Sequence, residues 1–161
     1  MIKTVSPIAN NCEKTMNKIP NISDWSGYES DFDSKEAFKN FFGKSNEQMR
    51  KNYRENISIL ATDLRFMPTT PFRYYVIGFK DFLCNEPLDD FSKGEAASSL
   101  FRIVEYKAEH QPTDILPVIE DLLSTLEDIA GNQEKYDLSI SICGDYSEKL
   151  SRIKYLLGLK P

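Results

Sequence analysis

The segment from Met67 to Cys84 is the most apolar stretch of an otherwise polar chain, and it constrains the fold more than any other. Its large side chains recur at spacings of three and four residues, which is the period of an α-helix. Thr70 and Pro71 are typical of a helix start, because threonine can cap free N–H groups and proline is tolerated in the first turn. The pattern predicts a central helix covered on more than one side by its neighbours, with these apolar residues: Phe72, Tyr74, Tyr75, Val76, Ile77, Phe79, Phe82 and Leu83.

Gly78 interrupts this predicted helix, where a glycine costs about 1 kcal/mol relative to alanine. We expect that it permits the close approach of a neighbouring helix. A fully buried strand is the alternative interpretation, since tyrosine, valine, isoleucine and phenylalanine also favour strands. A membrane span is disfavoured, because the segment is short and contains Arg73, Lys80 and Asp81.

Capping residues and helical periods predict helices through most of the remaining chain. Met49, Tyr53, Ile57, Leu60 and Leu64 follow one narrow stripe, which predicts a single amphipathic helix. Three pairs have the spacing of a capping box: Ser45 with Gln48, Ser92 with Glu95, and Asp145 with Glu148. The fold class is therefore predicted as all-α, an irregular bundle of about six to seven helices over about 33–42, 45–65, 70–84, 92–107, 113–131, 134–144 and 145–157.

Two segments are less regular than these helices. Residues 1–32 contain Pro7, Pro20 and Gly27, which break long helices, and are predicted to form an irregular arm packed on a single all-α domain of residues 33–161. Trp25 is expected to anchor this arm. Residues 134–144 alternate like a strand around Leu138, but a helix is favoured because an isolated strand would lack a partner.

Length, charge and cysteine content limit the classes of function. The chain has 161 residues and a net charge of −5, which disfavours nucleic acid and anionic membranes as main partners. Cys12, Cys84 and Cys143 form no CxxC pair, as is typical of reduced thiols in the cytoplasm. The N-terminus has no long apolar run of the kind found in secretory signals. These features predict a cytoplasmic protein.

The chain has few of the residues that enzymes use. His110 is the only histidine, which excludes a metal site built on several imidazoles, and it falls in a break between predicted helices. Neither a phosphate-binding glycine loop nor a nucleophile elbow is present. We therefore predict no catalytic residues, no metal site, no cofactor and no enzymatic activity. Arg50, Arg54 and Arg65 form the one candidate nucleic-acid patch, but a solvated helix flank is the favoured interpretation.

The carboxylates of residues 113–131 form the main candidate binding surface. Glu120, Asp121, Glu127 and Asp128 repeat at seven residues, and with Asp114 they lie opposite the leucines of the predicted helix. A solvated face, a recognition surface for a basic partner and paired catalytic carboxylates are the three interpretations, and the last would require a cleft. The loop residues that extend the candidate partner-binding set are Asp89 and Asp90.

Charge is unevenly distributed along the sequence, which favours binding of another protein. Residues 33–66 have seven Lys or Arg against five Asp or Glu, whereas residues 113–161 have five against nine. In its small size, acidity and helical character the chain is similar to the immunity proteins of bacterial toxin systems, which cover a basic toxin domain with an acidic surface. The alternatives are a structural or adaptor domain acting as a homodimer and an enzyme that uses carboxylates and tyrosines.

Overall fold

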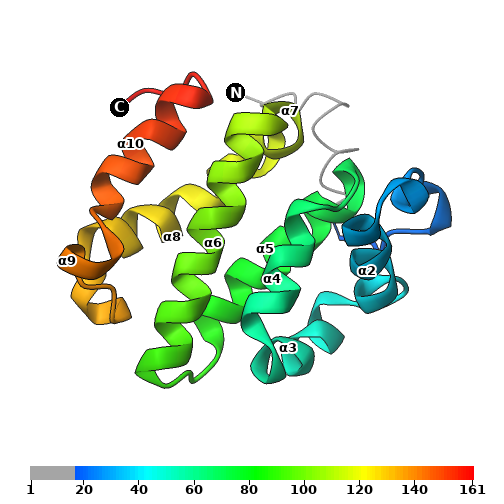
Figure 1. Cartoon of the computed structure of the whole chain (residues 1–161), viewed down its shortest axis with the longest axis horizontal. Helices are drawn as coiled ribbons and strands as arrows, with labels where there is room; N and C mark the ends of the chain where they lie inside the picture. Colours follow the sequence, from blue (N-terminus) through cyan, green and yellow to red (C-terminus); the bar gives the residue numbers. More distant parts are fainter. Residues whose placement is uncertain (1–16) are drawn as a thin grey trace, which may run out of the picture.

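The computed structural model of the chain describes residues 17–161, and the part of the predicted arm before residue 17, with Cys12, lies outside this range. Over the described residues the fold is all-α, as predicted, with no strand (Figure 1). The α-helices are α2 (Phe32–Phe41), α3 (Asn46–Glu55), α4 (Ile57–Arg65), α5 (Thr69–Asn85), α6 (Asp90–His110), α7 (Pro112–Ile115), α8 (Ile119–Gly131), α9 (Ile140–Cys143) and α10 (Tyr146–Leu156). Short 3₁₀ helices are η1 (Ile22–Trp25), η2 (Tyr28–Ser30), η3 (Leu116–Val118) and η4 (Gln133–Tyr136).

Helix α5 is the predicted central helix, and it contacts α3, α4, α6, α7, α8 and η1. Its side chains at Phe72, Tyr75, Val76 and Phe79 are fully buried, which confirms that it is covered on several sides. The predicted threonine cap is wrong, because the helix begins at Thr69 directly after Pro68 and has no side-chain cap. The hydroxyl of Thr69 instead donates a hydrogen bond to Asp114.

Gly78 lies where α5 meets the start of α3, and the expected close approach is confirmed. A Cβ atom at this position would lie 2.0 Å from Oδ1 of Asn46. The amide of Asn46 donates to the backbone oxygen of Tyr74 at 3.0 Å, so its side chain crosses the surface that the glycine leaves open. Glycine at this position therefore allows a side chain of α3 to bind the backbone of α5.

The single helix predicted for residues 45–65 is wrong, because Asn56 divides it into α3 and α4. Asn56 has φ −159° and ψ 72°, which is not helical. The apolar stripe of the sequence remains buried on both sides of this break. Because α3 packs mainly on α5 and α4 packs mainly on α6, the two halves of the stripe cover different neighbours, which one straight helix could not do.

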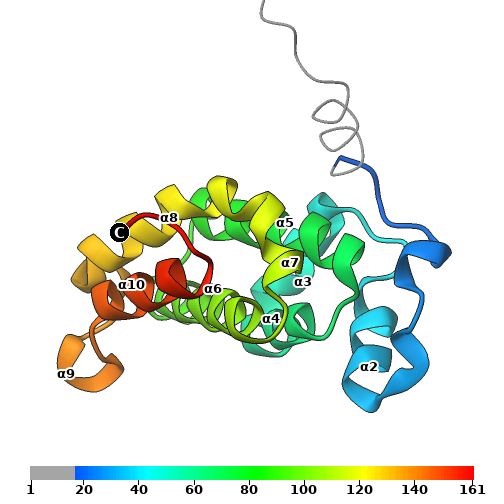
Figure 2. The same cartoon turned by 90° about the horizontal axis from the view of Figure 1, so that it is seen from above.

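The helices form two layers in the view of Figure 2, with α4, α6 and α10 on one side and α5 and α8 on the other. Helices α4 and α6 run in the same direction. Near the start of both, the Ser58 hydroxyl donates to the Glu95 carboxylate, and near their ends the rings of Phe66 and Tyr106 lie 5.9 Å apart. Helix α5 connects this parallel pair by returning in the other layer.

The predicted helix caps are confirmed in part. Ser45 and Gln48 form the capping box expected at α3. Asp145 caps α10 by accepting the backbone N–H of Ser147 at 2.8 Å, but the box predicted with Glu148 is not formed. The box predicted at Ser92 is wrong, because α6 begins at Asp90 and the side chain of Asp89 accepts the backbone N–H of Ser92 at 2.7 Å. Helix α2 likewise begins earlier than expected, with Asp31 as its cap.

Trp25 anchors the described part of the N-terminal arm, as expected. Its side chain is fully buried, and its ring packs edge-on against that of Phe38 with centroids 5.5 Å apart. The element that contains it, η1, contacts α5. The division of the chain into an arm and a domain at residue 32 stays a prediction.

The part of the chain between residues 17 and 161 contains seven α-helices of nine or more residues, in line with the expected number. These seven helices are not the same seven that were predicted. Residues 45–65 form two helices, and residues 134–144 form only the short turns η4 and α9. The predicted helix of residues 113–131 is also divided, into α7, η3 and α8, with Pro117 within η3. No helix in the described range has both the length and the apolar character needed to cross a membrane.

Candidate functional site

Helix α8 presents part of the predicted acidic face to solvent. Glu120 and Asp121 are exposed in its first turn. Glu127 is exposed two turns later, and its carboxylate lies 3.3 Å from Nζ of Lys154 on α10. The structure therefore brings these three predicted residues onto the exposed face of one helix.

Asp128 lies beside them but is held by its own chain. Its carboxylate accepts hydrogen bonds from the Tyr136 hydroxyl, from Nζ of Lys135 at 3.2 Å and from Nδ2 of Asn132 at 3.0 Å. The bond from Tyr136 and the charge of Lys135 keep the pKa of Asp128 below its ordinary value, although partial burial opposes this. Asp128 therefore fastens η4 to α8, and a partner would meet it only in competition with these contacts.

Asp114 does not lie on the acidic face, which corrects its predicted place. This residue belongs to α7 and is only 8% exposed. It accepts hydrogen bonds from Nζ of Lys107 at 3.0 Å and from the Thr69 hydroxyl at 2.7 Å. The prediction assumed one straight helix through residues 113–131, whereas the turn at Pro117 changes the direction in which the preceding residues face.

Asp89 and Asp90 are exposed at the start of α6. Asp89 is the cap of that helix, and the backbone N–H of Ser92 lowers its pKa from the ordinary value. The nearby Leu88 and Asp128 line the same hollow of about 420 Å³, so the start of α6 lies close to the end of α8. Because the carboxylate of Asp89 is engaged as the helix cap, Asp90 is the freer of the two predicted loop residues to contact a partner.

The candidate nucleic-acid patch is divided by ion pairs. Arg50 and Arg54 both bind the carboxylate of Glu86, with closest atoms 2.8 and 2.7 Å apart. The guanidinium of Arg65 instead lies over the rings of Phe66 and Tyr106, 5.5 and 5.6 Å from their centroids. The three arginines therefore do not form one continuous basic surface.

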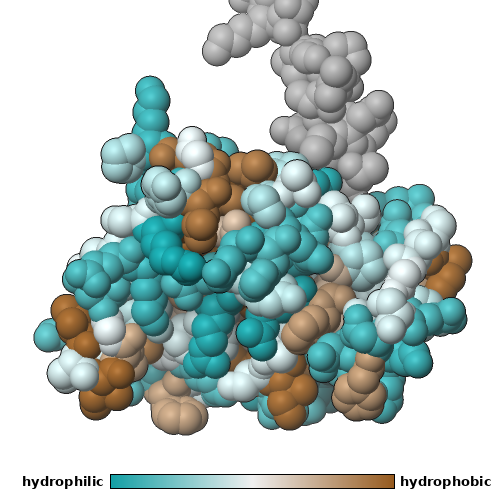
Figure 3. All heavy atoms as spheres, turned by 45° about the horizontal axis from the view of Figure 1, so that its top comes forward, coloured by the Kyte–Doolittle hydropathy of each residue, from teal (hydrophilic) through white to brown (hydrophobic). Residues whose placement is uncertain are grey.

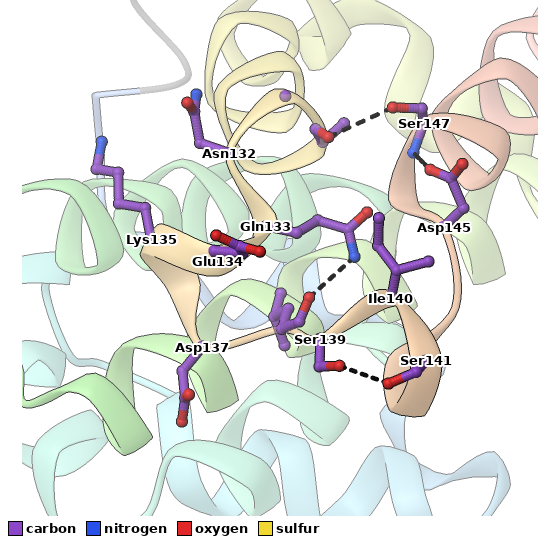
Figure 4. A pocket seen from close by; sticks show the side chains of 13 residues that line it. Asn132, Gln133, Glu134, Lys135, Asp137, Ser139, Ile140, Ser141, Asp145 and Ser147 are labelled. Carbon is purple, nitrogen blue, oxygen red and sulfur yellow. Dashed lines mark hydrogen bonds between the residues drawn. The ribbon is translucent and has the colours of Figure 1, made fainter.

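The largest hollow described in the structure, about 880 Å³, lies where α8 ends and α10 begins, and the sequence did not predict it. Figure 4 shows Ile140 lying between Gln133 and Asp145, while Lys135 and Asp137 point away from the centre. The lining comes from the end of α8, η4, α9 and the start of α10: Ala130, Gly131, Asn132, Gln133, Glu134, Lys135, Asp137, Leu138, Ser139, Ile140, Ser141, Asp145 and Ser147.

The buried side chain of Gln133 fixes the walls of this hollow. Its Nε2 donates to the backbone oxygens of Leu138 at 3.1 Å and Gly144 at 2.9 Å. Its Oε1 accepts the backbone N–H of Tyr146 at 2.8 Å. One amide therefore connects both ends of the loop that includes α9 to the start of α10. The sequence does not indicate this role, because a glutamine within a polar stretch looks like an ordinary surface residue.

Two large apolar side chains are exposed on α9, and one of them, Ile140, lines the hollow. Ile140 is 61% exposed and Ile142 is 85% exposed. In Figure 3 the surface is mainly hydrophilic, and hydrophobic side chains appear at the lower left, at the end of the molecule where Figure 1 places α9. An exposed apolar pair beside a concave surface is typical of an interaction site.

Negative charge is concentrated at this same end of the molecule. Residues 119–148 contain eight Asp or Glu against one Lys, whereas the whole chain has a net charge of −5. The rest of the chain is therefore slightly basic. A charge count over shorter windows would have found this concentration from the sequence. We define residues 119–148 as the acidic end.

Asp63 is the buried carboxyl with the clearest change in acidity. It is 6% exposed between α2 and α4, and Nδ2 of Asn40 donates to it at 2.7 Å. Burial raises its pKa to about 6, and the charges of Glu36 and Asp33 add to the rise although the Asn40 bond opposes it. It lines none of the four cavities described, so it gives no support to an enzymatic use of this carboxyl.

Replacing Asp63 with asparagine is expected to stabilise the protein at neutral pH. Because the folded pKa lies above the ordinary value of 3.8, the folded state binds the proton more tightly, and the wild type gains stability as the pH falls through about 6. A pKa difference of one unit corresponds to about 1.4 kcal/mol. The free energy of unfolding of the variant should therefore exceed that of the wild type by about 1–3 kcal/mol near pH 8, and this difference should shrink towards pH 4. Urea unfolding across this pH range measures the difference.

Asp121→Asn is the matched control, because this carboxylate is exposed on α8. Its effect on the free energy of unfolding should change little between the two pH values. An equal pH dependence in wild type and Asp63→Asn would contradict the assignment to Asp63.

Residues 17–161 hold no group of three or more His, Cys, Asp or Glu that could bind a metal ion. His110 is exposed in the last turn of α6 rather than in a loop, and its ring lies 4.6 Å from that of Tyr106. Cys84 is exposed, with its sulfur 3.5 Å from the Thr125 hydroxyl.

Comparison of the chain with protein-family models, with curated protein sequences and with solved structures gives no significant match. The function of the acidic end is therefore inferred from its charge, its exposed side chains and its shape.

Proposed function

We propose that this protein is a non-enzymatic protein-binding module whose acidic end binds a basic partner. In its specific form, the proposal is a toxin-neutralising protein of the immunity type in the bacterial cytoplasm, which blocks a basic toxin domain by covering it. The observation that carries the proposal is the concentration of eight carboxylates and one lysine in residues 119–148, next to the largest hollow described.

The proposed mechanism is electrostatic and steric. A surface with a strong negative potential accelerates the encounter with a positively charged partner, and added salt slows that encounter by screening. Glu120 and Asp121 suit this role, because no ion pair within the described chain engages them. Asp128 is less suited, because Tyr136, Lys135 and Asn132 already bind its carboxylate.

A structural or adaptor homodimer remains the second candidate. Ile59 on α4 and Phe91 on α6 are large, exposed apolar side chains outside residues 119–148, on two helices that pack against each other, which favours an apolar contact on that layer. A symmetric dimer through the acidic end itself is disfavoured, because it would place like charges opposite each other.

The test of the proposal is affinity capture from a lysate of the source organism with matched charge-reversal variants. Glu120→Lys with Asp121→Lys should reduce capture of a basic protein at least tenfold, because the double change makes the net charge of the acidic end four units more positive. The control is Glu47→Lys with Glu55→Lys, which makes the same change on exposed positions of α3. This control should capture the partner as the wild type does.

Both variants should keep the helical circular dichroism of the wild type. Reversal at the start of α8 is expected to cost only about 1–2 kcal/mol of stability through the helix dipole. Binding that survives reversal at Glu120 and Asp121 would show that this face is only solvated surface. A purified stable dimer that captures no protein would instead support the adaptor interpretation.

A further inference from the structure

We propose that the hollow beside α9 is the seat of a short segment of the partner protein that is both basic and apolar, with Ile140 and Ile142 as its apolar contact. This inference rests on the proposed function, since it names the part of the acidic end that the partner enters. The two isoleucines would add an apolar contact to a site whose charge alone does not distinguish one basic partner from another.

Helix α9 leaves two isoleucines exposed. Ile142 is 85% exposed and Ile140 is 61% exposed, although both belong to a single helical turn that contacts the hollow. The other apolar residue of that turn, Cys143, packs partly against the core. Helix α9 is thus attached to the protein on one side and leaves two large branched side chains free on the other.

Hydrogen bonds hold the loop that includes α9 in place. Besides the three hydrogen bonds of Gln133, the backbone N–H of Cys143 donates to Ser139 at 2.7 Å and the Ser147 hydroxyl donates to Ala130 at 3.3 Å. The isoleucines are therefore presented in a fixed place. A preformed surface loses little conformational entropy on binding, which is typical of recognition sites.

The charge of the lining identifies the occupant. Three carboxylates and one lysine line the hollow, but Asp137 and Lys135 point away from its centre, which leaves the carboxylates of Glu134 and Asp145 (Figure 4). A lysine or arginine of a partner would meet carboxylates there, while an apolar neighbour of that residue would contact the isoleucines. A second copy of this chain would bring a similarly acidic end against the first, so the occupant is a segment of a different, basic protein.

The experiment uses the full chain labelled with ¹⁵N and three synthetic ten-residue peptides. The first peptide contains leucine and lysine, the second serine and lysine, and the third leucine and glutamate. We expect the leucine–lysine peptide to shift backbone amide signals within residues 131–147, and to bind at least tenfold more tightly than either of the others. Shifts spread along α4 and α6 instead, or equal binding of all three peptides, would overturn the inference.

The variant Ile140→Ser with Ile142→Ser should weaken the leucine–lysine peptide at least tenfold and keep the fold, because neither side chain belongs to the buried core. Ile59→Ser, which changes an exposed isoleucine on α4, is the control and should bind as the wild type does. Unchanged peptide binding by the α9 variant overturns the inference. If lysate capture is still lost in Glu120→Lys with Asp121→Lys, the proposed function stands without it.

Discussion

Replacing Phe79 with alanine should lower the free energy of unfolding by about 3–5 kcal/mol, the range typical of removing a buried aromatic side chain. Phe79 is fully buried on the central helix α5. Its ring packs against that of Tyr53 on α3, with centroids 5.1 Å apart, and lies 6.1 Å from that of Phe82. The substitution therefore leaves a cavity between α5 and α3, and the tightly packed neighbours can fill it only in part.

Urea unfolding followed by far-ultraviolet circular dichroism measures the effect of Phe79→Ala. Ile59→Ala is the matched control, because this apolar side chain is exposed on α4 and should cost less than about 1 kcal/mol. A loss below about 1 kcal/mol at Phe79 would show that α5 is not packed as described.

Replacing Lys107 with alanine should cost about 3–5 kcal/mol, because it leaves a buried carboxylate without its counter-charge. Nζ of Lys107 is completely buried and lies 3.0 Å from the Asp114 carboxylate. The ammonium also lies 4.6 Å from the centroid of Phe72, where a cation interacts with the ring face. Burial lowers the pKa of Lys107 from its ordinary value, although the bond to Asp114 opposes this.

A double-mutant cycle separates this pair from its surroundings. Lys107→Ala with Asp114→Ala should be less destabilising than the sum of the single changes, because the second substitution removes the unpaired charge. The control is Lys135→Ala, which breaks the more exposed pair with Asp128 and should cost less than about 1 kcal/mol. Additive single effects at Lys107 and Asp114 would contradict the burial of a coupled pair.

The sequence was sufficient where local pattern decides structure. The buried central helix, the close approach at Gly78, the capping box at Ser45 and the anchoring of Trp25 follow from helical period, residue size and capping chemistry. The failures lie where tertiary contacts decide. At Asn56 the periodic stripe continues without interruption, and only the need to cover two different helices divides it.

The candidate site was predictable in its charge and not in its shape. Exposure of Glu120 and Asp121 follows from the position of the leucines on α8, whereas the burial of Asp114 depends on a turn at Pro117 that the helical pattern does not record. The hollow depends on hydrogen bonds between Gln133 and residues up to 13 positions away, and spacing along a sequence does not reveal such bonds.

The parallel arrangement of α4 and α6 has a consequence for how the chain folds. Ser58 and Glu95 are 37 residues apart in sequence, and two parallel helices need an intervening crossover, which here is α5. Closing such a loop costs entropy before the contact is made, so we expect this interface to form late on the folding pathway. Substitutions between α4 and α6 should then accelerate unfolding more than they slow folding. We therefore expect the packing of α4 on α6 to set the rate at which the folded protein opens.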